Sequence, residues 1–214
     1  MKSNFINFFW DKTQLKLYSS RTLFIPQTNE MLISDIHLGK SEYFQSRGIP
    51  LTNNQDKANL KRIYESIDQL KPKKLVILGD LFHSQYSITE DLIKKLKKLS
   101  MYMKNRIELI VGNHDRGCFV KDIKYLKEKR SMNLIFTHEP IKFKEKNILN
   151  ICGHYHPKLI LKNKQDKLSF RCFALDKNKN TLFLPSYGDL TGGYLCTKEM
   201  KKWAIVSKDL IYEI

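Results

Sequence analysis

Five short segments rich in aspartate, asparagine and histidine follow one another through this 214-residue chain and constrain its fold more than any other feature. All but the last lie where an apolar run with the character of a strand gives way to polar residues, a common location for functional side chains in an α/β sheet. Together they contain every histidine of the chain except His83. The segments are Asp35-Ile36-His37, Gly79-Asp80, Gly112-Asn113-His114-Asp115, Thr137-His138 and Gly153-His154-Tyr155-His156.

The apolar periodicity around these segments predicts an alternation of strands and helices. Apolar strands are expected over residues 31–34, 75–78, 107–111 and 133–136, and each leads into one of the polar segments. An amphipathic helix is expected over residues 54–70, and a second is expected to open at a capping box formed by Ser87 and Glu90. Residues 39–50 are interpreted as a polar loop. This alternation of strands and helices indicates an α/β fold whose functional residues lie at the ends of the strands.

Short strands toward both ends of the chain predict additional sheet structure. Residues 15–18 and 22–25 have strand character, and after Ile148 the pattern changes to short strands separated by turns. Strands over 170–175 and 181–184 flank a turn at 176–180, so we expect a hairpin-rich second sheet packed on the first. A length of 214 residues and an apolar content of 42% suit one sizeable core, and we predict a single domain over residues 1–214.

The formal net charge of +16 favours a polyanionic partner, because basic surfaces concentrate phosphate backbones. The composition also supports another explanation. Lysine accounts for 31 of the 38 basic residues, and asparagine is frequent as well, as an AT-rich coding sequence would produce whatever the protein binds. Arginine is the preferred residue for bidentate phosphate contacts. Charge alone therefore leaves nucleic-acid binding and a solvated lysine-rich surface as alternatives.

The cysteines and the apolar runs indicate the cellular setting. Cys118, Cys152, Cys172 and Cys196 form no CxxC pair and no cluster, so we expect reduced thiols and neither a zinc ribbon nor a disulfide framework. The apolar stretch at residues 5–10 is too short and too interrupted for a signal sequence. Since no run approaches the roughly 20 apolar residues of a membrane span, we expect a soluble cytoplasmic protein.

The side chains of the five segments have the donor chemistry of a two-metal hydrolytic site. Asp35 and His37 are two residues apart, so in an extended segment they project to the same side and can hold one ion together. Asp80 follows an apolar strand, where a buried carboxylate is costly unless a cation compensates it, and its expected role is a bridge between two ions. The remaining donors are the amide oxygen of Asn113 and the imidazoles of His138, His154 and His156.

These donors favour manganese, iron or zinc, and we expect two divalent ions, with Mn2+ as the first candidate. Two ions about 3.5–4 Å apart can clamp a phosphoryl group and lower the pKa of a bridging water toward 7, so that hydroxide attacks phosphorus. His114 is expected outside the coordination sphere as the general acid for the leaving oxygen, and Asp115 is expected to orient its imidazole. A structural role is the usual alternative for one histidine, but five of six in ordered motifs argue against it.

Three further residues near these segments have open roles. Arg47 and Arg116 are candidate substrate contacts, and the aromatic neighbours of Arg47, Tyr43 and Phe44, could stack on a base. The alternatives are a loop packed against the body of the protein and an exposed arginine. His83 is interpreted as a loop histidine without a role, with a contact to substrate or to a metal ligand as the alternative.

In order and spacing, the five segments resemble the signature of the calcineurin-like metallophosphoesterase superfamily: D-x-H, G-D, G-N-H-[DE], a further histidine, and G-H-x-H. The resemblance covers residues 35–156. It implies a four-layer α/β/β/α sandwich of two mixed sheets flanked by helices, and it makes His114 the catalytic histidine. It also implies that one ion is held by Asp35, His37, Asp80 and His156 and the other by Asp80, Asn113, His138 and His154.

Segments around the ligands, together with others elsewhere in the chain, resemble a narrower group, the ligase-associated DNA damage response endonucleases known as PdeM. These segments are residues 35–40, 44–50, 153–157, 171–173 and 184–193. The resemblance implies a metal-dependent nuclease that works beside a DNA ligase and a helicase. We therefore expect a binuclear phosphodiesterase, with a DNA endonuclease in DNA repair as the leading function.

Two other functions remain as alternatives. The same site can serve many phosphate esters, so the substrate could be a small nucleotide or a lipid-linked molecule, hydrolysed by a phosphodiesterase or pyrophosphatase. A basic scaffold that binds nucleic acid without catalysis is the third possibility. The complete set of expected ligands argues against the scaffold.

Overall fold

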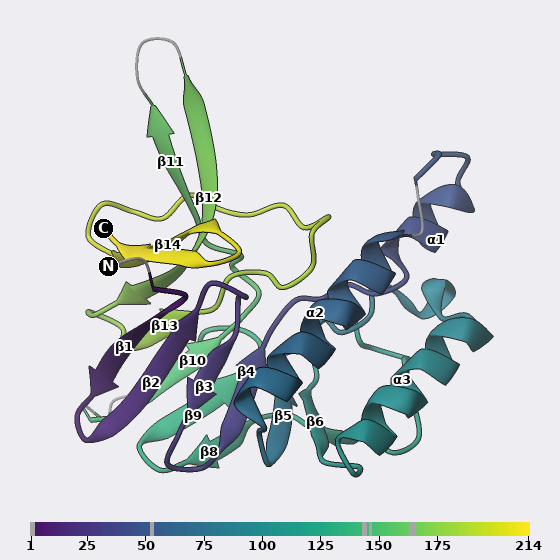
Figure 1. Cartoon of the computed structure of the whole chain (residues 1–214), viewed down its shortest axis with the longest axis horizontal. Coiled ribbons are helices and arrows are strands. Elements are labelled where there is room, and N and C mark those ends of the chain that lie inside the picture. Colours follow the sequence, from purple (N-terminus) through teal and green to yellow (C-terminus); the bar gives the residue numbers. More distant parts are fainter. Residues whose placement is uncertain (1–2, 52–53, 143–144, 146, 163–165) are drawn as a thin grey trace.

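The computed structural model describes residues 3–51, 54–142, 145, 147–162 and 166–214, and it contains two β-sheets with helices beside the first (Figure 1). Each sheet includes both parallel and antiparallel strand pairs. The α/β class and the two mixed sheets predicted from the sequence are confirmed.

The first sheet has the strand order β1 to β7, so neighbours in the chain are also neighbours in the sheet. Its early strands pair as antiparallel hairpins, whereas β4 to β7 run parallel because longer segments connect them. The strands are β1 Phe5–Trp10, β2 Thr13–Tyr18, β3 Leu23–Ile25, β4 Glu30–Ile33, β5 Lys74–Ile77, β6 Ile107–Ile110 and β7 Lys124–Leu126. The apolar stretch at residues 5–10 is thus an edge strand, which the sequence did not predict.

The helices are α1 Lys40–Gln45, α2 Asn54–Leu70, the short 3-10 helix η1 Gln85–Ser87 and α3 Glu90–Tyr102. Helix α2 agrees with the predicted range, and the apolar faces of α2 and α3 pack on the first sheet. Helix α1 occupies part of the segment that was interpreted as a loop, and this interpretation was wrong. None of the helices in the described residues has the length and apolar character needed to cross a membrane.

The predicted capping box at the start of α3 was also wrong. Thr89 caps this helix, because its side-chain oxygen accepts the N–H of Leu92 at 3.2 Å. The hydroxyl of Ser87 instead donates to the carbonyl oxygen of Ser84 at 2.7 Å, at the end of η1. Helix α3 therefore begins at Glu90, beyond the residue expected to open it.

The second sheet has the order β15-β14-β12-β13-β10-β9-β8, and β11 pairs with β12. Its strands are β8 Lys129–Ser131, β9 Leu134–Thr137, β10 Leu149–Cys152, β11 Lys158–Lys162, β12 Lys167–Asp176, β13 Thr181–Phe183, β14 Lys201–Ser207 and β15 Leu210–Glu213. Strands β11 and β12 form a hairpin that projects from the body of the protein (Figure 1). The predicted hairpin-rich second sheet is confirmed.

Apolar side chains fill the space between the two sheets. Leu17 and Val76 of the first sheet belong to one buried cluster with Phe136, Phe173 and Trp203 of the second. Removing this much apolar surface from water is the main stabilising contribution to such a sandwich. The outer face of the second sheet has a smaller cluster, to which the loop after residue 193 contributes Cys196 and Met200. In the described residues, a loop lies on this face and the helices lie on the first sheet.

A loop at residues 185–191 supports the first polar segment and is itself held by charge. Two guanidinium groups contact the Asp189 carboxylate, that of Arg21 at 2.6 Å and that of Arg62 at 2.7 Å. Burial alone would raise the pKa of Asp189, but the charges of both arginines outweigh it and hold the pKa below its ordinary value. In the same loop, the Gly188 N–H donates to the backbone oxygen of Asp35 at 3.0 Å. The ion pairs therefore fix a loop that positions Asp35.

Replacing Asp189 by alanine leaves two partly buried guanidinium groups without their carboxylate, so we expect the free energy of unfolding to fall by about 2 kcal/mol. Urea unfolding measures this, with the exposed Asp209→Ala as the control. The pKa of Asp189 is depressed in the folded state, so its contribution is present above the unfolded pKa of about 3.9 and is lost as the pH falls through the folded pKa. A loss of stability that does not shrink in acid would contradict this assignment.

Candidate metal centre

The five polar segments leave parallel strands of both sheets and meet at one place. They follow β4, β5 and β6 in the first sheet and β9 and β10 in the second. The last segment also follows a strand, β10, which lies in the region after Ile148 where short strands were expected. Hydrogen bonds join the segments across the sheets: the His154 N–H donates to the Asp35 carboxylate, at 3.1 and 3.2 Å from its two oxygens, and His138 Nδ1 lies 2.9 Å from the Leu78 oxygen.

Five of the seven predicted ligands have a backbone with positive φ, a region that is unfavourable for residues with a side chain. Strain of this kind persists where the surrounding structure imposes it, and it concentrates at functional sites. The positive φ at Asp35 and His37 also means that this segment is not extended, although an extended segment was expected from the spacing of the two residues. The φ values are 53° at Asp35, 51° at His37, 50° at Asp80, 61° at His154 and 48° at His156.

The glycines of the motifs make room for the ligands of neighbouring segments. A Cβ atom on Gly79 would overlap the imidazole of His138, and one on Gly153 would overlap the carboxylate of Asp35. Gly79 also has a φ of 81°, which favours glycine. The glycine in each motif is therefore required by a ligand that comes from another strand.

Six of the seven predicted ligands form two groups, within each of which the candidate ligand atoms lie no more than 4.8 Å apart. The first group is Asp35, His37 and His156, and the second is Asp80, His138 and His154. Asn113 joins the second group, since its Oδ1 lies 3.1 Å from His138 Nε2. Asp80 lies between the groups, because its Oδ2 is 3.8 Å from His37 Nε2 and 3.5 Å from His138 Nε2.

The burial of these side chains tests whether they suit metal ions. His37 is only 6% exposed, and burial, followed by the neighbouring His114, lowers its pKa to about 2, so the ring is neutral. Neither of its nitrogens has a hydrogen-bond partner in the described residues. Burial also raises the pKa of Asp80, because the groups around it offset only part of the cost of burying its charge. Divalent cations would satisfy both groups, so the donor set fits them.

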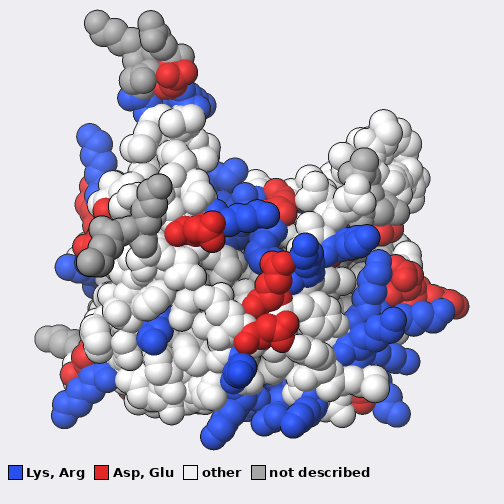
Figure 2. Space-filling model, viewed as in Figure 1, with Lys and Arg blue, Asp and Glu red and all other residues white. Residues whose placement is uncertain are grey.

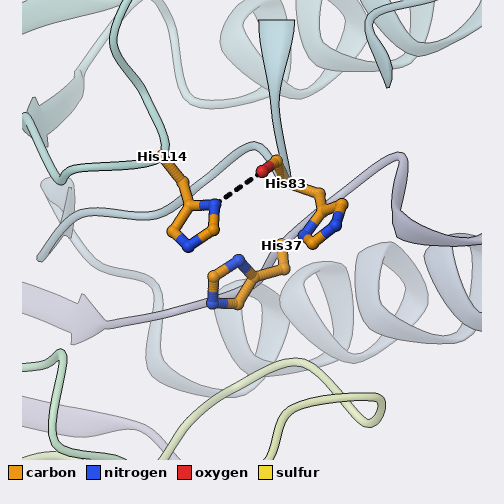
Figure 3. A group of neighbouring side chains, drawn as sticks. All are labelled: His37, His83 and His114. Atoms are coloured by element: carbon orange, nitrogen blue, oxygen red, sulfur yellow. Dashed lines mark hydrogen bonds between the residues drawn. The ribbon is translucent and has the colours of Figure 1, made fainter. Parts of the chain in front are cut away.

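Two ring nitrogens of the site have their protonation fixed by backbone carbonyls. Nδ1 of His114 lies 2.7 Å from the oxygen of His83, as Figure 3 shows, and Nδ1 of His138 faces a carbonyl in the same way. A carbonyl oxygen can only accept, so Nδ1 carries a proton in each ring. Nε2 of His138 is thereby left with a lone pair toward Asp80, and Nε2 of His114 is left to exchange a proton with a substrate.

Asp115 was predicted to orient the imidazole of His114, and this role was wrong. Its carboxylate accepts the backbone N–H groups of Asp80, Gly112 and Phe82 at 2.8, 2.9 and 3.1 Å. The turn after β6 brings the carboxylate back toward the end of β5, where the Asp80 and Phe82 donors lie. Asp115 therefore joins the two strand ends that carry Asp80 and His114, and the carbonyl of His83 orients the imidazole.

His83 is the residue of this region that the sequence interpretation underestimated. Its ring lies among those of His37 and His114, with candidate ligand nitrogens within 4.8 Å of one another (Figure 3). It stacks on His114 at a centroid distance of 5.6 Å, and burial lowers its pKa to about 4. The only sequence signal was its position three residues after Asp80, which does not determine the direction of a loop side chain.

A cleft of about 430 Å³ opens beside His114, and its lining includes Asn113 and Arg116. The structure therefore brings Arg116 to the site, as expected of a substrate contact. Arg47 lies farther out, with its guanidinium 4.6 Å from the ring centre of Tyr43, which in turn contacts the ring of His83. Only Arg116 of the two predicted arginines lines this cleft.

Comparisons with known proteins identify the family. The sequence profile of the calcineurin-like phosphoesterases matches residues 31–208, so the chain belongs to this family and is a metal-dependent phosphoesterase. The fold is similar to that of the Pseudomonas putida nuclease MPE, with a TM-score of 0.80 and 23% identity over 99% of this chain and 100% of that one. Yfce, a phosphoesterase from E. coli, gives a TM-score of 0.46 and 15% identity over 86% of this chain and 97% of that one. A search of curated protein sequences finds no match.

The close approach at Gly79 predicts that Gly79→Ala displaces His138 and weakens metal binding. We expect a loss of unfolding free energy of about 3 kcal/mol or more, from the unfavourable φ together with the overlap. Gly48→Ala is the matched control, because Gly48 has a similar φ of 78° but nothing within 4 Å of the added Cβ, so it should lose only about 1–2 kcal/mol. Equal losses in urea unfolding, with unchanged metal affinity, would contradict the role assigned to this glycine.

Proposed function

We propose that the chain is a phosphodiesterase that holds two divalent ions, with manganese as the first candidate, and that it cleaves DNA. The observation that carries the binuclear part is the position of Asp80 between the two ligand groups, within 4 Å of a histidine of each. One ion would be held by Asp35, His37, Asp80 and His156, and the other by Asp80, Asn113, His138 and His154. When bound, such a pair supplies charge stabilisation for a phosphoryl group and lowers the pKa of water between the ions.

The side chains around the pair have complementary tasks in this mechanism. Asp35 and Asp80 supply the negative charge that fixes the ions, while the neutral His37 adds nitrogen donors. His114 stands outside the two groups, at the cleft, with Nε2 free to donate a proton to the departing oxygen. The N–H of His114 donates to Asp80 Oδ1 at 3.0 Å, which fixes the position of the acid relative to the proposed bridging carboxylate.

DNA as substrate is supported by charge and by shape. The net charge is +16, and Figure 2 shows lysine and arginine side chains, with acidic ones among them, at the hollow between the β11–β12 hairpin and α1. Both projections adjoin the site, because α1 begins shortly after His37 and β11 shortly after His156. Arg116 in the cleft is the candidate contact to a phosphate beside the scissile bond. The fold similarity to a nuclease agrees with this substrate.

A role in DNA repair, with a DNA ligase and a helicase as partners, is proposed from the resemblance of the segments around the ligands to the PdeM group. The departures from that group, such as a lysine-rich surface, do not touch the proposed ligands. The role in DNA repair requires nuclease activity, so the nuclease activity is tested first.

Asp80→Asn should abolish manganese-dependent cleavage of a model phosphodiester, lowering turnover by about three orders of magnitude or more, because the bridging charge is lost. Bis-p-nitrophenyl phosphate hydrolysis by the metal-stripped and reloaded protein measures this. Asp91→Asn, at an exposed carboxylate on α3, is the control and should keep its activity. Unchanged turnover in Asp80→Asn would rule out the proposed mechanism.

Arg116→Ala should lower the cleavage of DNA by about tenfold and that of the small diester much less, because only DNA has phosphates beside the scissile bond. Arg106→Ala is the matched control, since Arg106 is exposed at the opposite, amino end of β6.

A second experiment tests the substrate class. The protein is incubated with circular and linear DNA, single- and double-stranded, in the presence of manganese, zinc or magnesium. Cutting of circles would establish an endonuclease. Hydrolysis of the small diester alone, without binding of DNA at low salt, would favour a small-molecule phosphodiesterase.

A further inference from the structure

Cys172 and Cys196 bring two thiols into contact on the outer face of the second sheet. Cys172 is fully buried in β12, and Cys196 is half-buried on the loop that lies on this face. Their Sγ atoms are 3.6 Å apart, and both thiols are free. We propose that this pair is a peroxide-reactive site, at which a reversible disulfide forms between Cys172 and Cys196.

The surroundings give the two sulfurs different reactivity. The contact with Cys172 lowers the pKa of the Cys196 thiol, and the amine of Lys202 acts in the same direction. The same contact, together with burial, raises the pKa of Cys172. Because the thiolate is the nucleophile, Cys196 is the sulfur that reacts first and Cys172 is the one that resolves the intermediate. Cys196 is also the more exposed of the two.

The other two cysteines provide an internal contrast. Cys118 is 6% exposed and Cys152 is fully buried. Burial raises the pKa of the Cys118 thiol to about 11 and that of Cys152 well above its ordinary value. Both stay protonated and inaccessible at neutral pH, so oxidation should be confined to the pair.

The reaction balances with hydrogen peroxide as the oxidant. The Cys196 thiolate attacks one oxygen of the peroxide, the O–O bond breaks, and a sulfenic acid forms as hydroxide leaves and takes up a proton. The Cys172 sulfur then attacks the sulfenic sulfur, an S–S bond forms, and the hydroxyl group leaves with the Cys172 proton as water. Two thiols and one peroxide give one disulfide and two waters. A dithiol reductant restores the thiols.

The loop that carries Cys196 lies against the segment that holds His154 and His156. The N–H of Lys158 donates to the Tyr194 oxygen at 2.8 Å, and the N–H of Cys196 donates to the Lys158 oxygen at 3.0 Å. The ring of Tyr194 also lies 5.4 Å from that of Tyr155, between the two histidines in sequence. A disulfide to β12 therefore holds this loop in place and restrains residues 153–156. Oxidation should stabilise the segment.

The test treats the full chain with a small excess of hydrogen peroxide and follows thiol count, intact mass and thermal unfolding. The thiols should fall from four to two, and the mass should fall by about 2 Da. The bridge closes 24 residues, so the midpoint of thermal unfolding should rise by about 5 °C or more. Dithiothreitol should reverse all three changes. None of these readouts depends on phosphodiesterase activity, so this test and that of the proposed function can fail separately.

Three variants complete the experiment. Cys196→Ser, on the half-buried loop, and Cys172→Ala should each prevent the loss of mass, whereas Cys118→Ser should still form the disulfide. Cys196→Ser decides the outcome if Cys172→Ala does not fold, because its side chain is partly exposed. A gain of oxygen mass, a cross-link between two chains, or a disulfide that survives in Cys196→Ser would overturn the proposal.

Discussion

The buried carboxylate of Asp35 holds the ends of the two sheets together, and the rest of the site depends on it. It belongs to the first sheet and is fully buried, yet its contacts come from the second: the N–H of His154, and Nε2 of His156 at 3.0 Å. A buried carboxylate is stable only with hydrogen-bond donors and positive charge around it. These contacts hold the segment after β10 against the segment after β4.

Bringing side chains from five strand ends to one point strains the backbone, and glycines in the motifs prevent overlap between neighbouring segments. Ligands such as Asp80 and His156 adopt a positive φ, and Gly79 and Gly153 leave space where a side chain would collide with a ligand. The hydrophobic contacts between the sheets and under α2 and α3 are the source of stability that sustains this strain. Burial then lowers the pKa of His37, so that its imidazole stays neutral.

Much of this arrangement could be predicted from the sequence, because apolar periodicity indicates the buried helices and strands and residue type indicates the candidate metal ligands. Helix α2 was predicted over its full range, and the apolar strands before the first four polar segments were found, since burial leaves a pattern. The edge strand β8, with the sequence Lys-Arg-Ser, has no such pattern and exists through pairing with β9. Helix α1 is too short for periodicity to show.

The roles of Asp115 and His83 could not be predicted for a related reason. The residue type shows what a side chain can do, but a turn determines which neighbour it meets. Asp115 turns back to the backbone at the end of β5, and the carbonyl of His83 meets the imidazole that Asp115 was expected to orient. The ligand types were predictable because only a few residue types offer such donors. Hydrogen bonds to backbone N–H and carbonyl groups, such as those of Asp115 and His114, could not be predicted because every residue has these groups.

The seven ligand side chains are proposed to hold two ions joined by one carboxylate. Electron paramagnetic resonance of the manganese-loaded protein, together with metal analysis, tests it most directly. Two manganese ions about 3.5–4 Å apart and bridged by Asp80 should give two metals per chain and a spin-coupled spectrum. One manganese per chain with the uncoupled signal of an isolated ion would contradict the binuclear site.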